Sequence, residues 1–116
     1  MRAPLQHVVL IKLHDVADTG ALLADTRRHL SAVPDVVELY VGQPCAVGRT
    51  GVDLDWDVAV IVGFADRGAY EAYLAHPEHI RLISAWKPRF EWIRVHDALE
   101  APEPPPAGGE APQPAH

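Results

Sequence analysis

The segment from Trp56 to Phe64 is the most hydrophobic strand-like stretch of the chain, and it limits the possible folds more than any other feature. Successive residues of a strand point to opposite faces of a sheet. Here both sets are small or apolar, and they are Val58, Val60 and Val62 on one face and Ala59, Ile61 and Gly63 on the other. A strand of this kind needs cover on both sides. We therefore expect a central strand with helices against one face and a cavity or a partner against the other.

The remaining segments alternate between strand and helix patterns. Aliphatic and β-branched residues dominate the strand segments, whereas apolar residues recur every three or four positions in the helical ones. The expected strands are residues 7–14, 36–42, 56–64 and 90–96, and the expected helices are residues 19–33 and 65–75. The order strand, helix, strand, strand, helix, strand is that of the split, ferredoxin-like α+β plan, whose sheet carries its helices on one face. The other face is left for a partner or a site.

A proline interrupts the second helical segment. Pro77 disfavours helical geometry at His76 and suits the first position of a new helix. We therefore expect a break at His76 and a third helix from Pro77 to about Ala85. This break leaves Tyr73 one turn before it and His79 in the first turn after it.

Charge and cysteine content exclude several classes of function. The chain has a formal net charge of −6 and no stripe of basic residues, so nucleic acid and anionic membranes are poor partners. The apolar run that ends at Leu13 is interrupted by Lys12 and is too short to span a bilayer. Cys45 is the only cysteine, which rules out an intramolecular disulfide and favours a reducing compartment. We expect a cytoplasmic protein.

The chain divides into a folded domain and a tail. Residues 1–98 have the composition of one domain, whereas residues 99–116 hold six of the 11 prolines and no aromatic or β-branched residue. We predict that this tail is disordered. A domain of about a hundred residues loses much of its interior to any enclosed ligand cavity. We therefore expect it to share walls with a second copy in a homodimer.

Three short segments together resemble the stress-responsive dimeric α/β-barrel (Dabb) domain family. They are HVVLIKL at residues 7–13, VPDV at residues 33–36 followed by Gly42, and YLAHPEH at residues 73–79 ahead of a final strand that ends at Asp97. The resemblance covers about residues 5–97. It implies a homodimeric barrel with a ligand pocket between the sheet and the helices, and it does not imply one activity.

The resemblance extends to residues of a site. Plant polyketide cyclases of this fold, of the olivetolic acid cyclase type, use a tyrosine and a histidine that match Tyr73 and His79, and a pocket histidine of theirs matches His7. Another of their pocket histidines is replaced here by Val58. Together with the alternation of faces along the strands, this gives a set of candidate substrate contacts, namely His7, Val9, Val58, Val60, His76 and Trp92.

Tyr73 and His79 suit an intramolecular aldol closure. This reaction needs a base to remove a proton next to a carbonyl and a donor to stabilise the oxyanion. His79 would be the base, because a helix N-terminus disfavours an imidazolium, although Glu78 acts in the opposite direction. Tyr73 would be the donor. The hypothesis is a cyclase or lyase-like enzyme that acts on a poly-carbonyl small molecule with neither cofactor nor metal.

Other interpretations stay open, including whether the protein is an enzyme at all. In a purely structural role, Tyr73 would pack on the sheet and His76 and His79 would cap the helix break. The protein would then be a non-catalytic stress-responsive homodimer that binds a small apolar ligand. A third function is that of the cofactor-free monooxygenases among related dimeric barrels. A metal site at His76 and His79 is disfavoured, because the sequence shows no third ligand nearby.

Overall fold

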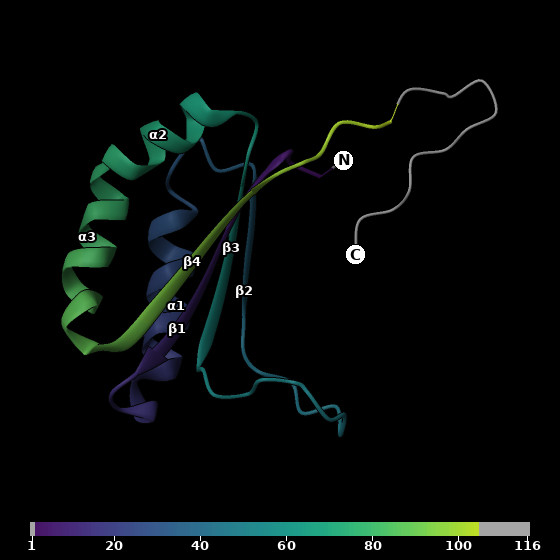
Figure 1. Ribbon diagram of the computed structural model, residues 1–116. Coiled ribbons are helices and arrows are strands. Elements are labelled where there is room, and N and C mark those ends of the chain that lie inside the picture. Colours follow the sequence, from purple (N-terminus) through teal and green to yellow (C-terminus); the bar gives the residue numbers. More distant parts are fainter. Residues whose placement is uncertain (1, 105–116) are drawn as a thin grey trace.

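The two most apolar strands lie in the middle of a four-stranded antiparallel sheet (Figure 1). The computed structural model describes residues 2–104. In that range the strands are β1 (Leu5–Leu13), β2 (Glu38–Gly42), β3 (Val58–Phe64) and β4 (Phe90–Leu99), in the spatial order β2-β3-β1-β4. The helices α1 (Thr19–Leu30), α2 (Arg67–Ala75) and α3 (Pro77–Trp86) lie on one face of this sheet. The predicted ferredoxin-like α+β plan is confirmed.

Alternation along the two central strands builds the core. In β1 the odd-numbered residues are buried under the helices, and the even-numbered residues are half-buried on the opposite face. Val58, Val62 and Phe64 of β3 have no exposed surface. Leu22 and Leu30 of α1 belong to the same core. The three- and four-residue spacing that predicted an apolar helix face therefore identified residues that are buried.

The predicted helix break lies at His76. This residue has φ −69° and ψ 136°, which is extended backbone between α2 and α3. Its Nδ1 accepts a hydrogen bond from the backbone N–H of Glu78 at 3.1 Å, so the side chain caps α3. Asp66 caps α2 in the same way, because its carboxylate accepts from the backbone N–H of Ala69 at 2.8 Å. Two capped helices thus replace one continuous helix.

The ends of several elements differ from the prediction. α1 ends at Leu30 rather than at Val33, because the chain turns where the Val33 N–H bonds to the Leu30 carbonyl at 3.2 Å. β4 continues to Leu99, past the predicted end at His96, because it pairs with β1 as far as Leu5. The predicted disorder of the tail concerns mainly residues 105–116, which lie outside the described residues.

The face of the sheet opposite the helices is open (Figure 1). The apolar side chains on this open face are half-buried at Val8, Leu10 and Ile61, and Tyr40 beside them is 58% exposed. No helix within residues 2–104 is both long and apolar enough to cross a membrane. The open face therefore offers a group of partly exposed apolar side chains to a partner.

The cap at Asp66 gives a test of how α2 is stabilised at its N-terminus. We expect Asp66→Ala to lower the free energy of unfolding by about 1 kcal/mol, because α2 loses the acceptor for the Ala69 N–H. Urea denaturation followed by circular dichroism measures this change. Glu71→Ala, in the exposed pair with Arg67 one turn further on, should leave stability nearly unchanged. Equal effects of the two variants would contradict the capping role.

Candidate functional site

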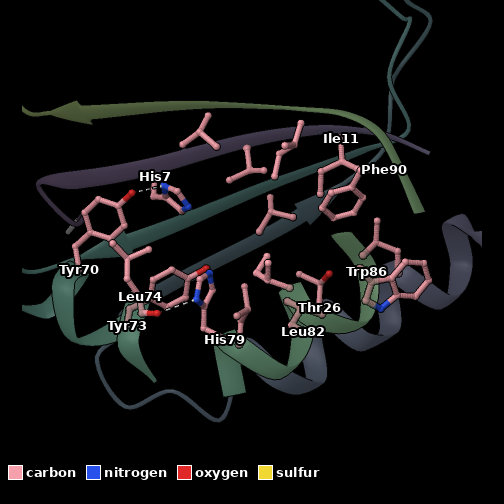
Figure 2. A pocket seen from close by; sticks show the side chains of 17 residues that line it. His7, Ile11, Thr26, Tyr70, Tyr73, Leu74, His79, Leu82, Trp86 and Phe90 are labelled. Atoms are coloured by element: carbon pink, nitrogen blue, oxygen red, sulfur yellow. Dashed lines mark hydrogen bonds between the residues drawn. The ribbon is translucent and has the colours of Figure 1, made fainter. Parts of the chain in front are cut away.

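A pocket of about 300 Å³ lies between the sheet and the helices (Figure 2). Its polar side chains gather at one end, where His7 of β1 faces Tyr70, Tyr73 and His79 from α2 and α3. The other end is mostly apolar and is formed by Ile11, Leu82, Trp86 and Phe90, with the hydroxyl of Thr26 beside them. The pocket therefore has one end suited to hydrogen bonding and one end suited to an apolar group.

Exposed apolar side chains surround the opening of the pocket. Leu74 of α2 and Ile93 and Val95 of β4 line it and are 44%, 43% and 46% exposed. Because β4 is an edge strand, nothing within residues 2–104 pairs with its outer side. The pocket is therefore reached between β4 and the helices α2 and α3.

Tyr73 and His79 lie side by side at the polar end. Their ring centroids are 4.4 Å apart, and Tyr73 is 3% exposed. Nδ1 of His79 lies 3.2 Å from the backbone carbonyl of Leu74. A carbonyl only accepts, so Nδ1 carries the proton of this bond, and Nε2 of the neutral ring keeps a free lone pair. Figure 2 shows that ring nitrogen directed into the pocket.

Burial sets the protonation states of this pair. It lowers the pKa of His79 below the usual 6.5, and the nearby His7 lowers it further, while the bond to the Leu74 carbonyl opposes the shift. Burial also raises the pKa of the Tyr73 hydroxyl well above its usual value. Both groups are therefore neutral near pH 7, which leaves one base and one hydrogen-bond donor. The sequence predicted a neutral His79 from the helix dipole, whereas burial is the main cause in the structure.

A second polar group adjoins the first. His7 is 6% exposed, and its Nδ1 lies 2.6 Å from Asp97 Oδ1 and 3.0 Å from the Tyr70 hydroxyl. The Tyr70 hydroxyl donates to Asp97 Oδ2 at 2.9 Å. Burial and the bond to Asp97 raise the pKa of Tyr70 to about 12. Desolvation acts to raise the pKa of Asp97, but the hydrogen bonds from His7 and Tyr70 outweigh it and hold that pKa below its usual value.

Sequence reasoning did not select Tyr70 or Asp97 as site residues. Two signals could have found them. Tyr70 lies three positions before Tyr73 and therefore on the same side of α2. Asp97 continues the face of β4 on which Ile93 and Val95 line the pocket, so its carboxylate is the polar end of an apolar row.

The six predicted substrate contacts separate into two groups. His7, Val9 and Val60 line the pocket. Val58 lies beneath it as a fully buried core residue, and His76 caps α3. Trp92 pairs with Lys12 of β1, whose side chain points to the open face, so Trp92 lies on the open face as well. The Arg94 guanidinium lies over the Trp92 ring, 4.2 Å from its centroid. Val58, His76 and Trp92 therefore do not line the pocket.

The described residues offer no metal site. Across residues 2–104 no three histidine, cysteine, aspartate or glutamate side chains lie close enough together to hold a metal ion.

Comparison with protein families identifies one matching model. It describes the Stress responsive A/B Barrel Domain, and it matches residues 5–99. That range runs from the first residue of β1 to the last residue of β4, so it includes every element around the pocket. A comparison with curated proteins finds no match.

Several solved structures share the fold. A dimeric ferredoxin-like protein of unknown function from Thermobifida fusca is 16% identical, with a TM-score of 0.69, covering 82% of this chain and 89% of that one. A hydroxynitrile lyase from Passiflora edulis is 14% identical, with a TM-score of 0.74, covering 87% and 96%. A cofactor-independent oxygenase from Streptomyces nogalater is 16% identical, with a TM-score of 0.64, covering 89% and 97%. At these identities the similarity establishes the fold and not the activity.

The half-buried His79 predicts a specific pH dependence. We expect the His79 ring to titrate below pH 6.5 in a histidine NMR titration of the folded chain. Because the unfolded chain then binds the proton more tightly, the stability that neutral His79 contributes is complete above pH 6.5 and is lost as the pH falls through its folded-state pKa. Replacing His79 with Gln should remove this part of the pH profile in urea denaturation. A His79 midpoint at or above 6.5 would contradict the assignment.

Proposed function

The chain belongs to the stress-responsive A/B barrel domain family, and on that premise we propose that it is an acid-base enzyme that makes or breaks carbon–carbon bonds next to carbonyl groups without a cofactor. One observation carries the proposal. The rings of His79 and Tyr73 share the polar end of one pocket, and their centroids are 4.4 Å apart. A neutral histidine and a protonated tyrosine are the two groups that an aldol closure needs.

The proposed reaction begins with proton removal by His79. Its Nε2 takes a proton from the carbon between two carbonyl groups of the substrate, and the resulting enolate carbon attacks a second carbonyl carbon. A carbon–carbon bond forms while the π electrons of that carbonyl move to its oxygen. The Tyr73 hydroxyl donates a hydrogen bond to this oxygen, and the proton held by His79 then neutralises it. Substrate and product are isomers, so no oxidant or reductant is required.

The shape of the pocket supports an amphipathic poly-carbonyl substrate. Its carbonyl groups would lie beside Tyr73 and His79, and its apolar part would extend toward Ile11, Trp86 and Phe90. A volume of about 300 Å³ is at the lower end of the range for small-molecule sites. We therefore propose a compact substrate of the polyketide type rather than a long chain.

The same residues can run the reaction backward. Cleavage of a β-hydroxy carbonyl compound needs a base for its hydroxyl proton and a donor for the departing enolate, which are again His79 and Tyr73. The related fold of a hydroxynitrile lyase supports this lyase direction. The related cofactor-independent oxygenase supports a third possibility, which differs because it must consume oxygen.

We also propose that the chain works as a homodimer through the open face of its sheet. The half-buried Val8, Leu10 and Ile61 would be covered by the same face of a second copy. The dimeric relative from Thermobifida fusca supports this arrangement. A non-catalytic homodimer that binds an apolar ligand is the alternative, and turnover distinguishes the two.

Substitution of the acid-base pair tests the enzymatic proposal. We expect His79→Gln and Tyr73→Phe each to lower the rate of cyclisation of a linear 1,3,5,7-tetracarbonyl probe by at least about a hundredfold, because each removes one proton-transfer or hydrogen-bonding group. Product formation is followed by chromatography, with oxygen uptake recorded in parallel. His14→Gln, an exposed histidine outside the pocket, should leave the rate unchanged. Binding of the probe without turnover in the wild-type chain would favour the non-catalytic alternative.

A charge on the open face tests the homodimer. We expect Leu10→Glu to convert the dimer to a monomer, because a carboxylate facing a second apolar sheet loses its hydration. Size-exclusion chromatography with light scattering gives the mass, and circular dichroism verifies that the fold is kept. Val16→Glu, which adds the same charge at a 70% exposed position before α1, should remain dimeric. A wild-type chain that runs as a monomer would overturn this part of the proposal.

A further inference from the structure

His7 lies in the pocket opposite His79, and neither of its hydrogen-bonding neighbours takes part in the reaction proposed above. Those neighbours are Asp97 at the end of β4 and Tyr70 in α2, and both contact Nδ1 of the His7 ring. The Tyr70 hydroxyl also bonds to the second carboxylate oxygen of Asp97. The three side chains therefore form a closed group that joins β1, α2 and β4.

The donors and acceptors of this group place one proton. A carboxylate only accepts, so the 2.6 Å contact between His7 Nδ1 and Asp97 Oδ1 needs a proton on Nδ1. The single proton of the Tyr70 hydroxyl points to Asp97 Oδ2 at 2.9 Å, so toward His7 the Tyr70 oxygen can only accept. Both neighbours of Nδ1 are acceptors. Nδ1 therefore carries a proton, and when the ring is neutral this is its single proton and Nε2 has the free lone pair.

Figure 2 shows where that lone pair is directed. Nδ1 of His7 faces Tyr70, and the other ring nitrogen points away from it, into the space occupied by Tyr73 and His79. The His7 and Tyr73 ring centroids are 5.9 Å apart, which is close enough for one small group to contact both. His7 and His79 then present two acceptor nitrogens to the pocket, and Tyr73 presents one donor.

We propose that Asp97 and Tyr70 are positioning residues that hold the proton of His7 on Nδ1, so that Nε2 accepts a hydrogen bond from the enol hydroxyl of a 1,3-dicarbonyl substrate. Asp97 is the stronger of the two, because its contact is shorter and charge-assisted. The enolised dicarbonyl unit is the acceptor end of the substrate, because it offers its hydroxyl to His7 and the carbonyl oxygen under attack to Tyr73, while His79 removes the proton from the nucleophilic carbon elsewhere in the same molecule. This substrate assignment rests on the proposed function, whereas the position of the proton does not.

The position of the proton is measured by ¹⁵N NMR of the imidazole rings. The full chain is titrated, the His7 signals are assigned with His7→Gln, and the tautomer is taken from the high-pH plateau. We expect the wild-type ring to be protonated mainly at Nδ1, the reverse of free neutral histidine, which favours Nε2. In Asp97→Ala the Tyr70 hydroxyl loses its acceptor and donates to Nδ1 instead, so the main tautomer should change to Nε2–H. Tyr70→Phe leaves Asp97 in place and should keep Nδ1–H.

A matched variant separates this effect from a general loss of charge. Glu91→Gln removes one carboxylate from an exposed position on the same strand and should leave the His7 tautomer unchanged. A wild-type ring protonated mainly at Nε2 would overturn the inference. An Asp97→Ala chain whose His7 ring keeps the wild-type tautomer would also overturn the inference.

The kinetic consequence is measured with the linear poly-carbonyl probe of the cyclisation assay. We expect Asp97→Ala to lower kcat by about 10- to 100-fold, the range seen when the partner that orients a metal-bound histidine is removed, and to raise KM as well, because His7 contacts the bound enol. No turnover by the wild-type chain would contradict the proposed function and leave the tautomer measurement to decide the role of Asp97. An altered tautomer with unchanged kcat would overturn the role of His7 toward the substrate.

Discussion

The helix break at His76 is the constraint on which the candidate site depends. In a continuous helix the Leu74 carbonyl would accept from the backbone N–H of Glu78 four residues later. Here that N–H bonds to the His76 side chain, and the Leu74 carbonyl accepts from His79 Nδ1. The break thus frees an acceptor and supplies the histidine that uses it. Pro77 therefore fixes both the orientation of the His79 ring and the nitrogen that carries its proton, because it creates the break.

Burial then gives two different groups complementary roles. Removing water penalises the charged form of any side chain, so it lowers the pKa of a histidine and raises that of a tyrosine. His79 and Tyr73 are adjacent at the polar end of the pocket, and burial holds both neutral. A neutral imidazole is a base and a neutral phenol is a donor. The arrangement therefore needs no further charged group beside either of them.

Much of the fold and part of the site could be predicted from local patterns. The two-residue period of β1 and β3 identified the buried faces, and the helical period identified Leu22 and Leu30 as core residues. Tyr73, His79 and His7 line the pocket, as the family resemblance implied. Trp92 was placed in the pocket and lies on the open face, because alternation gives two sets of residues on β4 and does not say which set meets the helices.

The sequence by itself determined the order of the elements and the break at Pro77, because each element and the break depend on residues close together in the chain, whereas the choice of Tyr73 and His79 as a pair came from the family resemblance. Only the tertiary structure decided that His7, Tyr70 and Asp97 form one group. Asp97 lies 90 residues after His7, and their contact exists because β1 pairs with β4 in one particular register. Register depends on how two strands and the helices above them pack together, and no local pattern contains that information.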